Sequence, residues 1–300
     1  MSAGDRTPDE YEMRQLRDAL AEDLGERGDI TSALTLGGRG PVAVGRIVAK
    51  AEGRLSGVDL AAAVFGLVDA AIELDVARGN GDAVKPGDIV LTMRGPAASL
   101  LEAERTALNV LCHLSGVATL TSRFVAATAG THARIVDTRK TTPGWRLREK
   151  AAVRDGGGHN HRIGLYDEVL IKENHLAIAG LHDITAVVAR VRRDAPPGTR
   201  IIVEAEDLTQ ALAAADGGAD VLLLDNFPLD DLAAAVQRLA DHPRRADFAI
   251  EASGNMTLER IPSVAATGVD RISVGALTHS APVLDLSMLL DVQPAVAPPS

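Results

Sequence analysis

The first third of the chain mixes two spacings of apolar residues. Tyr11, Leu16, Leu20 and Leu24 recur at helical intervals and Gly25 follows as a stop signal, which predicts an N-terminal helix. Further apolar patterns predict strands at 42–51 and 71–76, a helix at 58–68 and a long helix at 98–112. This part of the chain is therefore expected to form a mixed α+β unit.

From about residue 116 to 282 the pattern changes to short β-branched runs that alternate with Ala/Leu-rich stretches. The expected strands are 134–138, 168–172, 201–204, 221–225, 248–251 and 271–275, and the expected helices include 184–193, 208–217, 230–241 and 258–268. Near-continuous apolar strands alternating with helices are typical of a parallel sheet covered by helices. An apolar segment, 284–292, precedes a Pro-rich tail, 293–300, which we expect to be disordered.

A polar or charged residue follows nearly every strand of this second part. In a barrel all carboxyl ends of the strands meet on one face, whereas an open sheet gathers such residues only at its switch point. We therefore predict an α/β protein with an N-terminal α+β sandwich-like domain at 1–114 and an α/β barrel with parallel strands at 115–282. One arrangement compatible with the sequence is that segment 283–300 returns to the first domain. No G-x-G-x-x-G motif opens a βαβ unit, which disfavours dinucleotide binding.

Composition narrows the class of protein. The 300 residues are 46% hydrophobic and 24% charged, which excludes a disordered chain. The net charge of −10 opposes non-specific binding to nucleic acid or an anionic membrane, and 2% aromatic residues leave little for base stacking. A single cysteine excludes an internal disulfide, and no apolar run approaches about 18 residues. We expect a cytoplasmic protein with neither nucleic acid nor membrane as partner.

The charge is unevenly distributed. Segment 139–162 contains seven Lys or Arg residues, two acidic residues and the run Gly156-Gly157-Gly158. Adjacent glycines let backbone N–H groups approach a ligand, and an arginine fork matches a carboxylate or phosphate. The segment indicates capture of a polyanionic small molecule; the alternative is a solvated basic helix followed by an ordinary loop.

Other strand ends carry further candidates. Glu204 and Asp225 follow neighbouring strands and suit Mg²⁺, which binds through one or two carboxylates plus substrate phosphates; the alternative is a structural salt bridge. The loops 253–255, before a helix expected near Thr257, and 275–279 are typical of a phosphate site. His159 and His161 lack a third ligand at zinc-like spacing, which disfavours a metal role.

At these residues the chain closely resembles the quinolinate phosphoribosyltransferase family. The resemblance is carried by segments 137–144 (DTRKTTPG), 150–165 (KAAVRDGGGHNHRIGL) and 169–175 (VLIKENH). Shorter matches are 22–32, 104–109, 114–118, 223–226 and 274–279, so the resemblance spans roughly residues 20 to 285. One departure is Ala151, where the family more often has an aromatic residue, and it bears on packing.

The resemblance implies an enzyme that joins quinolinate to phosphoribosyl pyrophosphate, releasing pyrophosphate and CO₂ and giving nicotinate mononucleotide for NAD synthesis. It implies that Arg139, His161 and Arg162 bind the quinolinate carboxylates, with Lys172 nearby. The residues implied on the phosphoribosyl side are Lys140, Lys172, Ser253, Gly254, Gly275 and His279. Glu204 and Asp225 are implied to face the ribose and Mg²⁺, and Lys140, Lys172, Glu204 and Asp225 are the expected catalytic group.

The resemblance also implies a homodimer in which Arg105 completes the quinolinate site of the neighbouring subunit. Without the resemblance, the preferred interpretation of Arg105 is a surface residue paired with Glu102 or Asn109 along its helix. Three other functions stay open on the residues themselves. They are a phosphoribosyltransferase for another pyridine carboxylate, a Schiff-base aldolase with Lys172 as nucleophile, and a non-catalytic anion-binding module.

Overall fold

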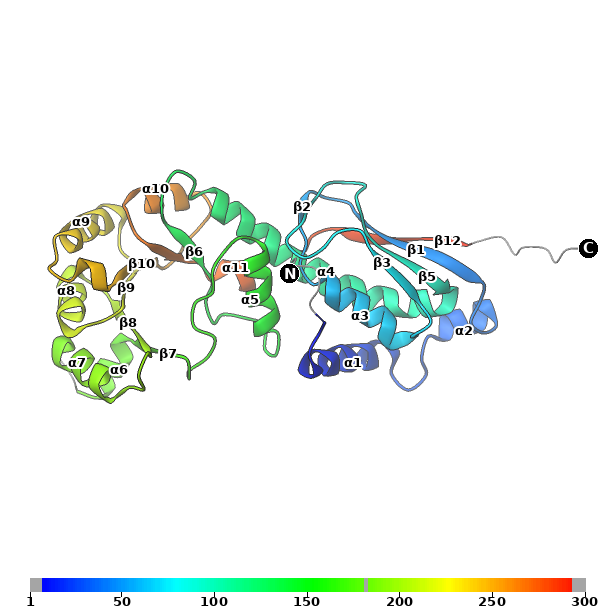
Figure 1. The fold of residues 1–300 in the computed structure, drawn as a ribbon, viewed down its shortest axis with the longest axis horizontal. Coiled ribbons are helices and arrows are strands. Elements are labelled where there is room, and N and C mark those ends of the chain that lie inside the picture. Colours follow the sequence, from blue (N-terminus) through cyan, green and yellow to red (C-terminus); the bar gives the residue numbers. More distant parts are fainter. Residues whose placement is uncertain (1–6, 181–182, 293–300) are drawn as a thin grey trace, which may run out of the picture. The chain divides into compact units, whose positions relative to one another are not determined.

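The computed structural model describes residues 7–180 and 183–292 (Figure 1). The chain divides into two compact units: unit 1 is Met1–Leu120 with Ala281–Ser300, and unit 2 is Thr121–Ser280. The sequence placed the divisions at 114/115 and 282/283, a few residues away. The tail expected at 293–300 lies outside the described residues. Within the described ranges, no helix combines the length and apolarity needed to cross a membrane.

Unit 1 contains an antiparallel sheet in the order β12-β1-β5-β3. Its strands are β1 (Val42–Ala49), β3 (Glu73–Val76), β5 (Ile89–Pro96) and β12 (Leu286–Val292). A separate two-stranded sheet pairs β2 (Gly53–Arg54) with β4 (Ala83–Val84). β12 pairs with β1 from Ala43–Val292 to Ala49–Leu286, so the segment after unit 2 completes the sheet of unit 1.

The helices of unit 1 are α1 (Glu10–Leu24), α2 (Ile30–Leu36), α3 (Val58–Val68) and α4 (Ala97–Ala126). α1 begins at a capping box in which Glu12 N donates to Asp9 Oδ1 at 2.9 Å and Asp9 N donates to Glu12 Oε2 at 2.6 Å. α3 contacts both α1 and β5, and Val64 and Phe65 of α3 are fully buried. Figure 1 shows α1 and α3 on the same side of the sheet.

α4 is longer than the sequence predicted. It was expected to end at residue 112, but it runs through Ser115-Gly116 to Ala126. A Cβ built on Gly116 would lie 2.2 Å from the carbonyl oxygen of Pro282. The glycine therefore admits a close-packed backbone inside the helix. Leu114, Val117 and Phe124 keep one face of the extended helix buried.

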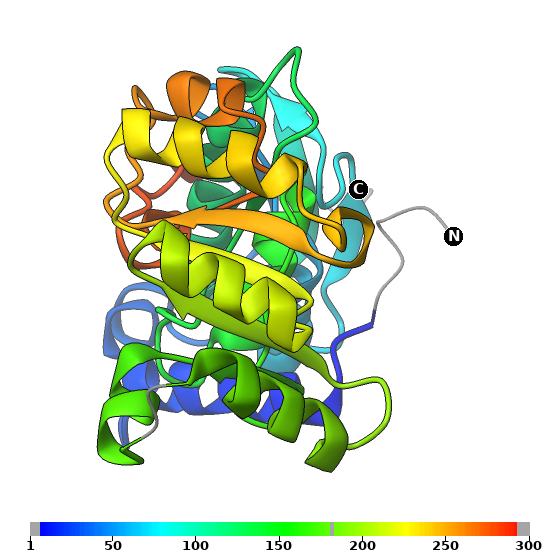
Figure 2. The same cartoon turned by 90° about the vertical axis from the view of Figure 1, so that its left-hand side faces the viewer.

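Unit 2 contains a six-stranded parallel sheet in the order β6-β11-β10-β9-β8-β7. The strands are β6 (Arg134–Val136), β7 (Glu168–Ile171), β8 (Arg200–Ala205), β9 (Val221–Asp225), β10 (Ala249–Ser253) and β11 (Arg271–Ser273). The helices are α5 (Arg146–Asp155), α6 (Glu173–Ile178), α7 (Ile184–Asp194), α8 (Leu208–Gly217), α9 (Leu229–Ala240), η1 (Arg245–Asp247, a 3₁₀ turn), α10 (Ile261–Ala266) and α11 (Ala276–His279). In Figure 2 the green to yellow helices α7, α8 and α9 lie side by side over the outer face of this sheet. The predicted α/β class with parallel strands is confirmed.

The inner face of the parallel sheet turns from apolar to polar toward the carboxyl ends of its strands. Ile202, Val221 and Leu223 form an apolar cluster, against which Leu170 and Ala249 pack. Leu223 marks the edge of this cluster. The strand register places Glu204 of β8 on one side of it and Glu251 of β10 on the other. Because side chains alternate along a strand, this inner face ends in charged and polar groups. Among the described residues no strand pairing joins β6 to β7, so both are edges of the hydrogen-bonded sheet.

Candidate active site

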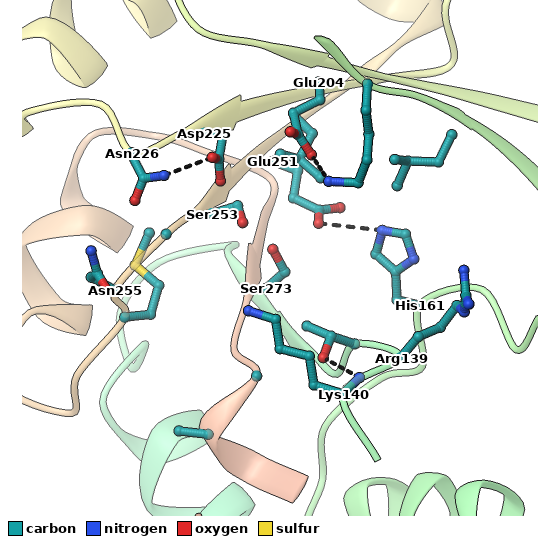
Figure 3. Close-up of a pocket in the computed structure, with 18 of the residues that line it drawn as sticks. Arg139, Lys140, His161, Glu204, Asp225, Asn226, Glu251, Ser253, Asn255 and Ser273 are labelled. Carbon is teal, nitrogen blue, oxygen red and sulfur yellow. Dashed lines mark hydrogen bonds and ion pairs between the residues drawn. The ribbon is translucent and has the colours of Figure 1, made fainter. Parts of the chain in front are cut away.

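A cavity of about 680 Å³ lies at the carboxyl end of the parallel sheet in unit 2 (Figure 3). It is lined by residues that follow all six strands, as the carboxyl ends of barrel strands require. The structure gathers the following predicted residues around it: Arg139, Lys140, His161, Arg162, Lys172, Glu204, Asp225, Ser253, Gly254, Gly275 and His279. Arg105 does not line it and lies exposed on α4 in unit 1.

One side of the cavity presents cations with unused hydrogen-bonding capacity. Arg139 Nε is buried and has no hydrogen-bond partner in the described part of the chain. Burial and the neighbouring charge of Arg139 lower the pKa of Arg162. The two guanidinium groups repel each other. A carboxylate or phosphate bound between them would relieve this repulsion, so the pair suits an anionic ligand.

His161 lies beside these arginines and is 8% exposed. Its Nδ1 accepts a hydrogen bond from the backbone N–H of Arg162 at 2.8 Å. An acceptor nitrogen carries no proton, so the proton of the neutral ring is on Nε2, which faces the cavity floor. Figure 3 shows the ring pointing inward from the loop before β7.

The opposite side carries carboxylates. Lys172, after β7, forms an ion pair with Glu204 at the end of β8. Burial raises the pKa of Glu204, and the nearby charge of Asp225 adds to the rise. Asp225 accepts a hydrogen bond from Asn226 Nδ2 at 2.6 Å. These contacts match the structural alternative of an ion pair for Glu204, while Asp225 keeps oxygen atoms available.

The two carboxylates also fit a divalent cation. Burial is the main cause of the raised pKa of Glu204, and the charge of Asp225 adds a smaller part that a bound cation would relieve. Oxygen ligands suit Mg²⁺, which commonly takes one or two carboxylates and completes its shell with phosphate and water. In the described ranges 7–180 and 183–292 no group of three or more His, Cys, Asp or Glu side chains is placed to hold a metal, so substrate oxygens would have to supply further ligands.

The loop after β10 interlocks with the loop after β9. Gly254 has φ +96°, and a Cβ there would lie 2.1 Å from Asn226 Oδ1. Asn226 and Asn255 adopt positive φ angles of 57° and 46°, a conformation that clusters at functional sites. Arg260 donates to the carbonyl oxygens of Gly254 and Phe227 at 3.1 and 2.9 Å, which ties the two loops together.

The helix expected to begin near Thr257 begins later. α10 starts at Ile261, with Pro262 in its first turn, so no helix terminus directly follows the 253–255 loop. On the other side of β11, a Cβ on Gly275 would lie 3.0 Å from Lys140 Cδ and 3.2 Å from His279 Nε2. The absence of a side chain at Gly275 therefore leaves room for the side chains of Lys140 and His279 beside it.

The basic segment 139–162 contributes less to the cavity than its charge suggested. Only Arg139, Lys140 and Arg162 of its seven Lys and Arg residues line it. Lys150 is buried in an ion pair with Asp137, and Arg154 donates to Asn160 Oδ1 at 2.5 Å. Charge counted along a segment does not reveal which side of a helix each cation occupies.

The expected role of Gly156-Gly157-Gly158 in approaching a ligand is also wrong. Their three N–H groups donate to the carbonyl oxygens of Ala152, Arg154 and Val153 at 2.8–2.9 Å. The glycines therefore end α5, with Gly157 at φ +87°. A Cβ on Gly158 would lie 2.8 Å from the side chains of Thr121 and Val153, which explains a glycine there by packing.

Sequence reasoning missed Glu251 and Ser273, which also line the cavity. Glu251 is fully buried, and its Oε2 lies 2.9 Å from Arg271 Nε. The signal was present, since a glutamate inside an otherwise apolar strand is rarely buried without a specific partner. The expected strand 248–251 ends at Glu251, and the strand-end candidates begin only after it, at 253–255; β10 itself runs on to Ser253.

The fold and the cavity define an α/β enzyme whose site, at the carboxyl end of a six-stranded parallel sheet, suits anionic small molecules. Two family models cover most of the chain: the N-terminal domain of quinolinate phosphoribosyl transferase matches residues 29–115, and the C-terminal domain matches residues 117–289. The chain belongs to the quinolinate phosphoribosyl transferase family.

Individual relatives agree with the family models. A Synechocystis protein named probable nicotinate-nucleotide pyrophosphorylase (carboxylating) is 44% identical over 276 residues, which cover 91% of this chain and 90% of that protein. The Mycobacterium leprae nicotinate-nucleotide pyrophosphorylase (carboxylating) is 42% identical over 280 residues, 91% of this chain and 95% of that one. The solved structure of the Francisella tularensis nicotinate-nucleotide pyrophosphorylase superposes with a TM-score of 0.86 at 36% identity, covering 95% of this chain and 98% of that one.

Proposed function

We propose that this chain transfers the phosphoribosyl group of phosphoribosyl pyrophosphate to quinolinate, with loss of CO₂, and so makes nicotinate mononucleotide for NAD synthesis. The observation that carries the proposal is that one cavity is lined both by the cations Arg139, Lys140, Arg162 and Lys172 and by the carboxylates Glu204 and Asp225. Quinolinate brings two adjacent carboxylates, and the cosubstrate brings a 5′-phosphate and a pyrophosphate. A site for both substrates needs many cations and a counter-charge for the ribose.

Quinolinate is proposed to bind on the arginine side. The buried Nε of Arg139 and the neighbouring Arg162 offer planar forks for the two carboxylates. His161 borders the same space, and Lys172 lies at its edge. Ring contacts from aromatic residues are not needed, because guanidinium groups can hold a charged pyridine.

The phosphoribosyl group is proposed to bind across the later strands. Its phosphate oxygens would accept hydrogen bonds from donors in the loops after β10 and β11 and from the side chain that follows β6. The proposed contacts are Lys140, Ser253, Gly254, Gly275 and His279, with Lys172 between the two substrates. Glu204 and Asp225 would face the ribose hydroxyls.

Magnesium is proposed as the metal, held by Glu204 and Asp225 together with substrate oxygens. When bound, it would offset the negative charge of the departing pyrophosphate. Lys172, paired with Glu204, would offset part of the negative charge of the two carboxylates before a cation binds.

The proposed reaction needs no side-chain nucleophile. The pyridine nitrogen forms a bond to the anomeric carbon of the ribose as the bond from that carbon to the pyrophosphate oxygen breaks. The ring nitrogen then carries a positive charge, which stabilises the electron pair left on C2 when the C2 carboxylate departs as CO₂. A proton completes C2, and Lys140 or water would deliver it. The chain contributes positioning and electrostatic stabilisation.

We also propose a homodimer in which Arg105 reaches the quinolinate site of the neighbouring subunit. Its exposure on α4 leaves the guanidinium available for such a contact. The proposed location is the cytoplasm, supported by the free thiol of Cys112, since reduced cysteines are usual in that compartment.

The alternatives are less well supported. A Schiff-base aldolase needs a lysine amine that is free to attack a carbonyl, whereas Lys172 is engaged in an ion pair with Glu204. A passive anion-binding module does not account for two carboxylates beside the cations. The family match favours quinolinate over another pyridine carboxylate.

The test is to incubate the protein with quinolinate, phosphoribosyl pyrophosphate and Mg²⁺ and to measure pyrophosphate and CO₂ together. We expect both products in equal amounts, none without Mg²⁺, and little pyrophosphate when nicotinate replaces quinolinate. Pyrophosphate without CO₂, or turnover with nicotinate alone, would overturn the proposed acceptor.

A further inference from the structure

A buried ion pair lies next to the cavity without lining it. The Nζ of Lys150, on α5, lies 2.5 Å from Oδ1 of Asp137, and these side chains are 2% and 0% exposed. We propose that Asp137 and Lys150 are positioning residues that hold His161 and Arg162 in place for quinolinate. The inference rests on the proposed function for the identity of the ligand, but not for the geometry.

The pair forms hydrogen bonds with both backbone groups of His161, its N–H and its carbonyl oxygen. Oδ1 of Asp137 accepts the His161 N–H at 2.8 Å, and Lys150 Nζ donates to the His161 carbonyl oxygen at 2.9 Å. Oδ2 of Asp137 accepts from Asn160 Nδ2 at 2.6 Å, and the same amide nitrogen donates to the Lys150 carbonyl oxygen at 2.8 Å. One carboxylate therefore fixes two consecutive residues of the loop.

The same carboxylate connects two segments of the cavity wall. Asp137 directly precedes Thr138, Arg139 and Lys140, which line the cavity after β6. His159 adds a short parallel bridge to β6. The His159 N–H donates to the Ile135 carbonyl oxygen at 2.9 Å, and the Asp137 N–H donates to the His159 carbonyl oxygen at 3.1 Å. Arg139 and Arg162 are thus held at a set separation through Asp137.

An ion pair is a costly way to fill buried space. Burial raises the pKa of Asp137 and lowers the pKa of Lys150, because both charged forms lose hydration. Apolar side chains of similar volume often stabilise a fold as well as or better than a buried pair. They would, however, leave the His161 N–H, the His161 carbonyl oxygen and the Asn160 amide without these partners. What the pair specifically provides is the orientation of the loop.

The central test compares the single variants Asp137→Asn and Lys150→Met with the double variant. Each single change leaves a buried charge or polar group unpaired, so we expect both to lower the melting temperature. The double variant removes both charges of the pair, so we expect its melting temperature to return toward that of the unmodified protein. Its KM for quinolinate should stay about 10-fold or more above normal, because an amide oxygen cannot replace the lost charge-assisted bonds. Its KM for phosphoribosyl pyrophosphate should change by less than about 3-fold, since all the contacts proposed for that substrate except Lys140 come from segments that the pair does not bond.

A second variant keeps the test decisive if the double variant folds poorly. Asn160→Ala removes the amide link and leaves the Asp137–Lys150 pair intact. We expect a melting temperature that is lowered less than in either single variant, because Asp137 Oδ2 loses one partner while the ion pair stays intact. The quinolinate KM should rise by about 3- to 10-fold, which corresponds to the loss of one hydrogen bond. A folded Asn160→Ala or double variant with unchanged quinolinate KM would show that the pair only stabilises the fold.

Amide hydrogen exchange separates this inference from the proposed function. In the double variant, peptides covering 159–163 should exchange faster while peptides covering 221–225 keep their protection. This readout needs no substrate. Unchanged exchange at 159–163 would overturn the positioning role even if the enzyme acts on quinolinate, and a protein inactive on quinolinate with the expected exchange would overturn only the proposed ligand.

Discussion

His161 and Glu251 face each other across the floor of the cavity, with imidazole Nε2 3.5 Å from carboxylate Oε1 (Figure 3). The imidazole must present a proton on Nε2, because its Nδ1 already accepts the Arg162 N–H. Arg271 approaches the same carboxylate from the neighbouring strand. The loop that carries His161 is therefore held by Asp137 at its backbone and faces an anion at its ring.

Replacing Glu251 with Gln should destabilise unit 2 at neutral pH. Burial alone raises the pKa of Glu251, but the facing proton of His161 and the charge of Arg271 outweigh it and hold the pKa below its usual value. The change leaves Arg271 buried without its counter-charge, a loss of about 3–5 kcal/mol in free energy of unfolding. Urea unfolding at pH 7 measures it.

The pH dependence of that loss has a definite sign. Since the folded-state pKa of Glu251 is depressed, its stabilising contribution is complete above the ordinary value of 4.5 and is lost as pH falls through the folded pKa. The difference in stability between the unmodified protein and Glu251→Gln should therefore shrink below pH 4.5. A difference that grows on acidification would contradict the assignment of a buried carboxylate anion.

Arg139→Ala and Arg162→Ala should each weaken quinolinate binding far more than phosphoribosyl pyrophosphate binding. Loss of one charge-assisted hydrogen bond corresponds to about 10- to 150-fold in KM for quinolinate. Arg193→Ala, which removes an exposed cation from α7, is the matched control and should leave both KM values unchanged. Equal losses for the two substrates would remove the arginines from the quinolinate site.

Glu204→Gln should change the pH profile of catalysis. Because burial and the charge of Asp225 raise the pKa of Glu204, an activity that requires its anion should fall on the acid side at a pH above the ordinary value of 4.5. In the Gln variant kcat should be lower throughout and that acid limb should disappear. Glu206→Gln, an exposed glutamate just after β8, is the control. If the acid limb of the pH profile is unchanged in Glu204→Gln, that limb reports the titration of another group.

A shared site predicts complementation between two inactive variants. Subunits carrying Arg105→Ala and subunits carrying Lys172→Ala should be mixed and allowed to exchange. Each hybrid dimer would contain one site with both residues intact, so an equal mixture should recover about a quarter of normal activity. Mass spectrometry verifies the hybrids, and verified hybrids without activity would place Arg105 outside the partner's site.

The alternation of apolar strands and helices was sufficient to predict unit 2. Expected strand 221–225 and expected helix 208–217 match β9 and α8 residue for residue. Strand-end residues such as Glu204 and Asp225 converge because parallel strands place their carboxyl ends together, which the sequence alone implies.

What the sequence concealed depends on contacts between distant residues. Lys150 does not line the cavity because it forms a buried ion pair with Asp137. Gly116 is required inside its helix because the backbone of Pro282 packs against it. Neither partner can be inferred from local pattern. Glu251 was concealed for a different reason: its inward direction depends on where β10 begins, and strand boundaries are poorly determined by composition.

β12 gives the chain an order of assembly that differs from its order of synthesis. During translation, unit 1 emerges first, yet β1 has no neighbour on one side until residues 286–292 leave the ribosome. Unit 2 is continuous in sequence and has all its strands by then. A nascent or truncated chain would thus expose an unpaired β-edge, the surface on which strands of other chains add. β12, the last strand to be synthesised, therefore completes the sheet that begins with β1, the first strand.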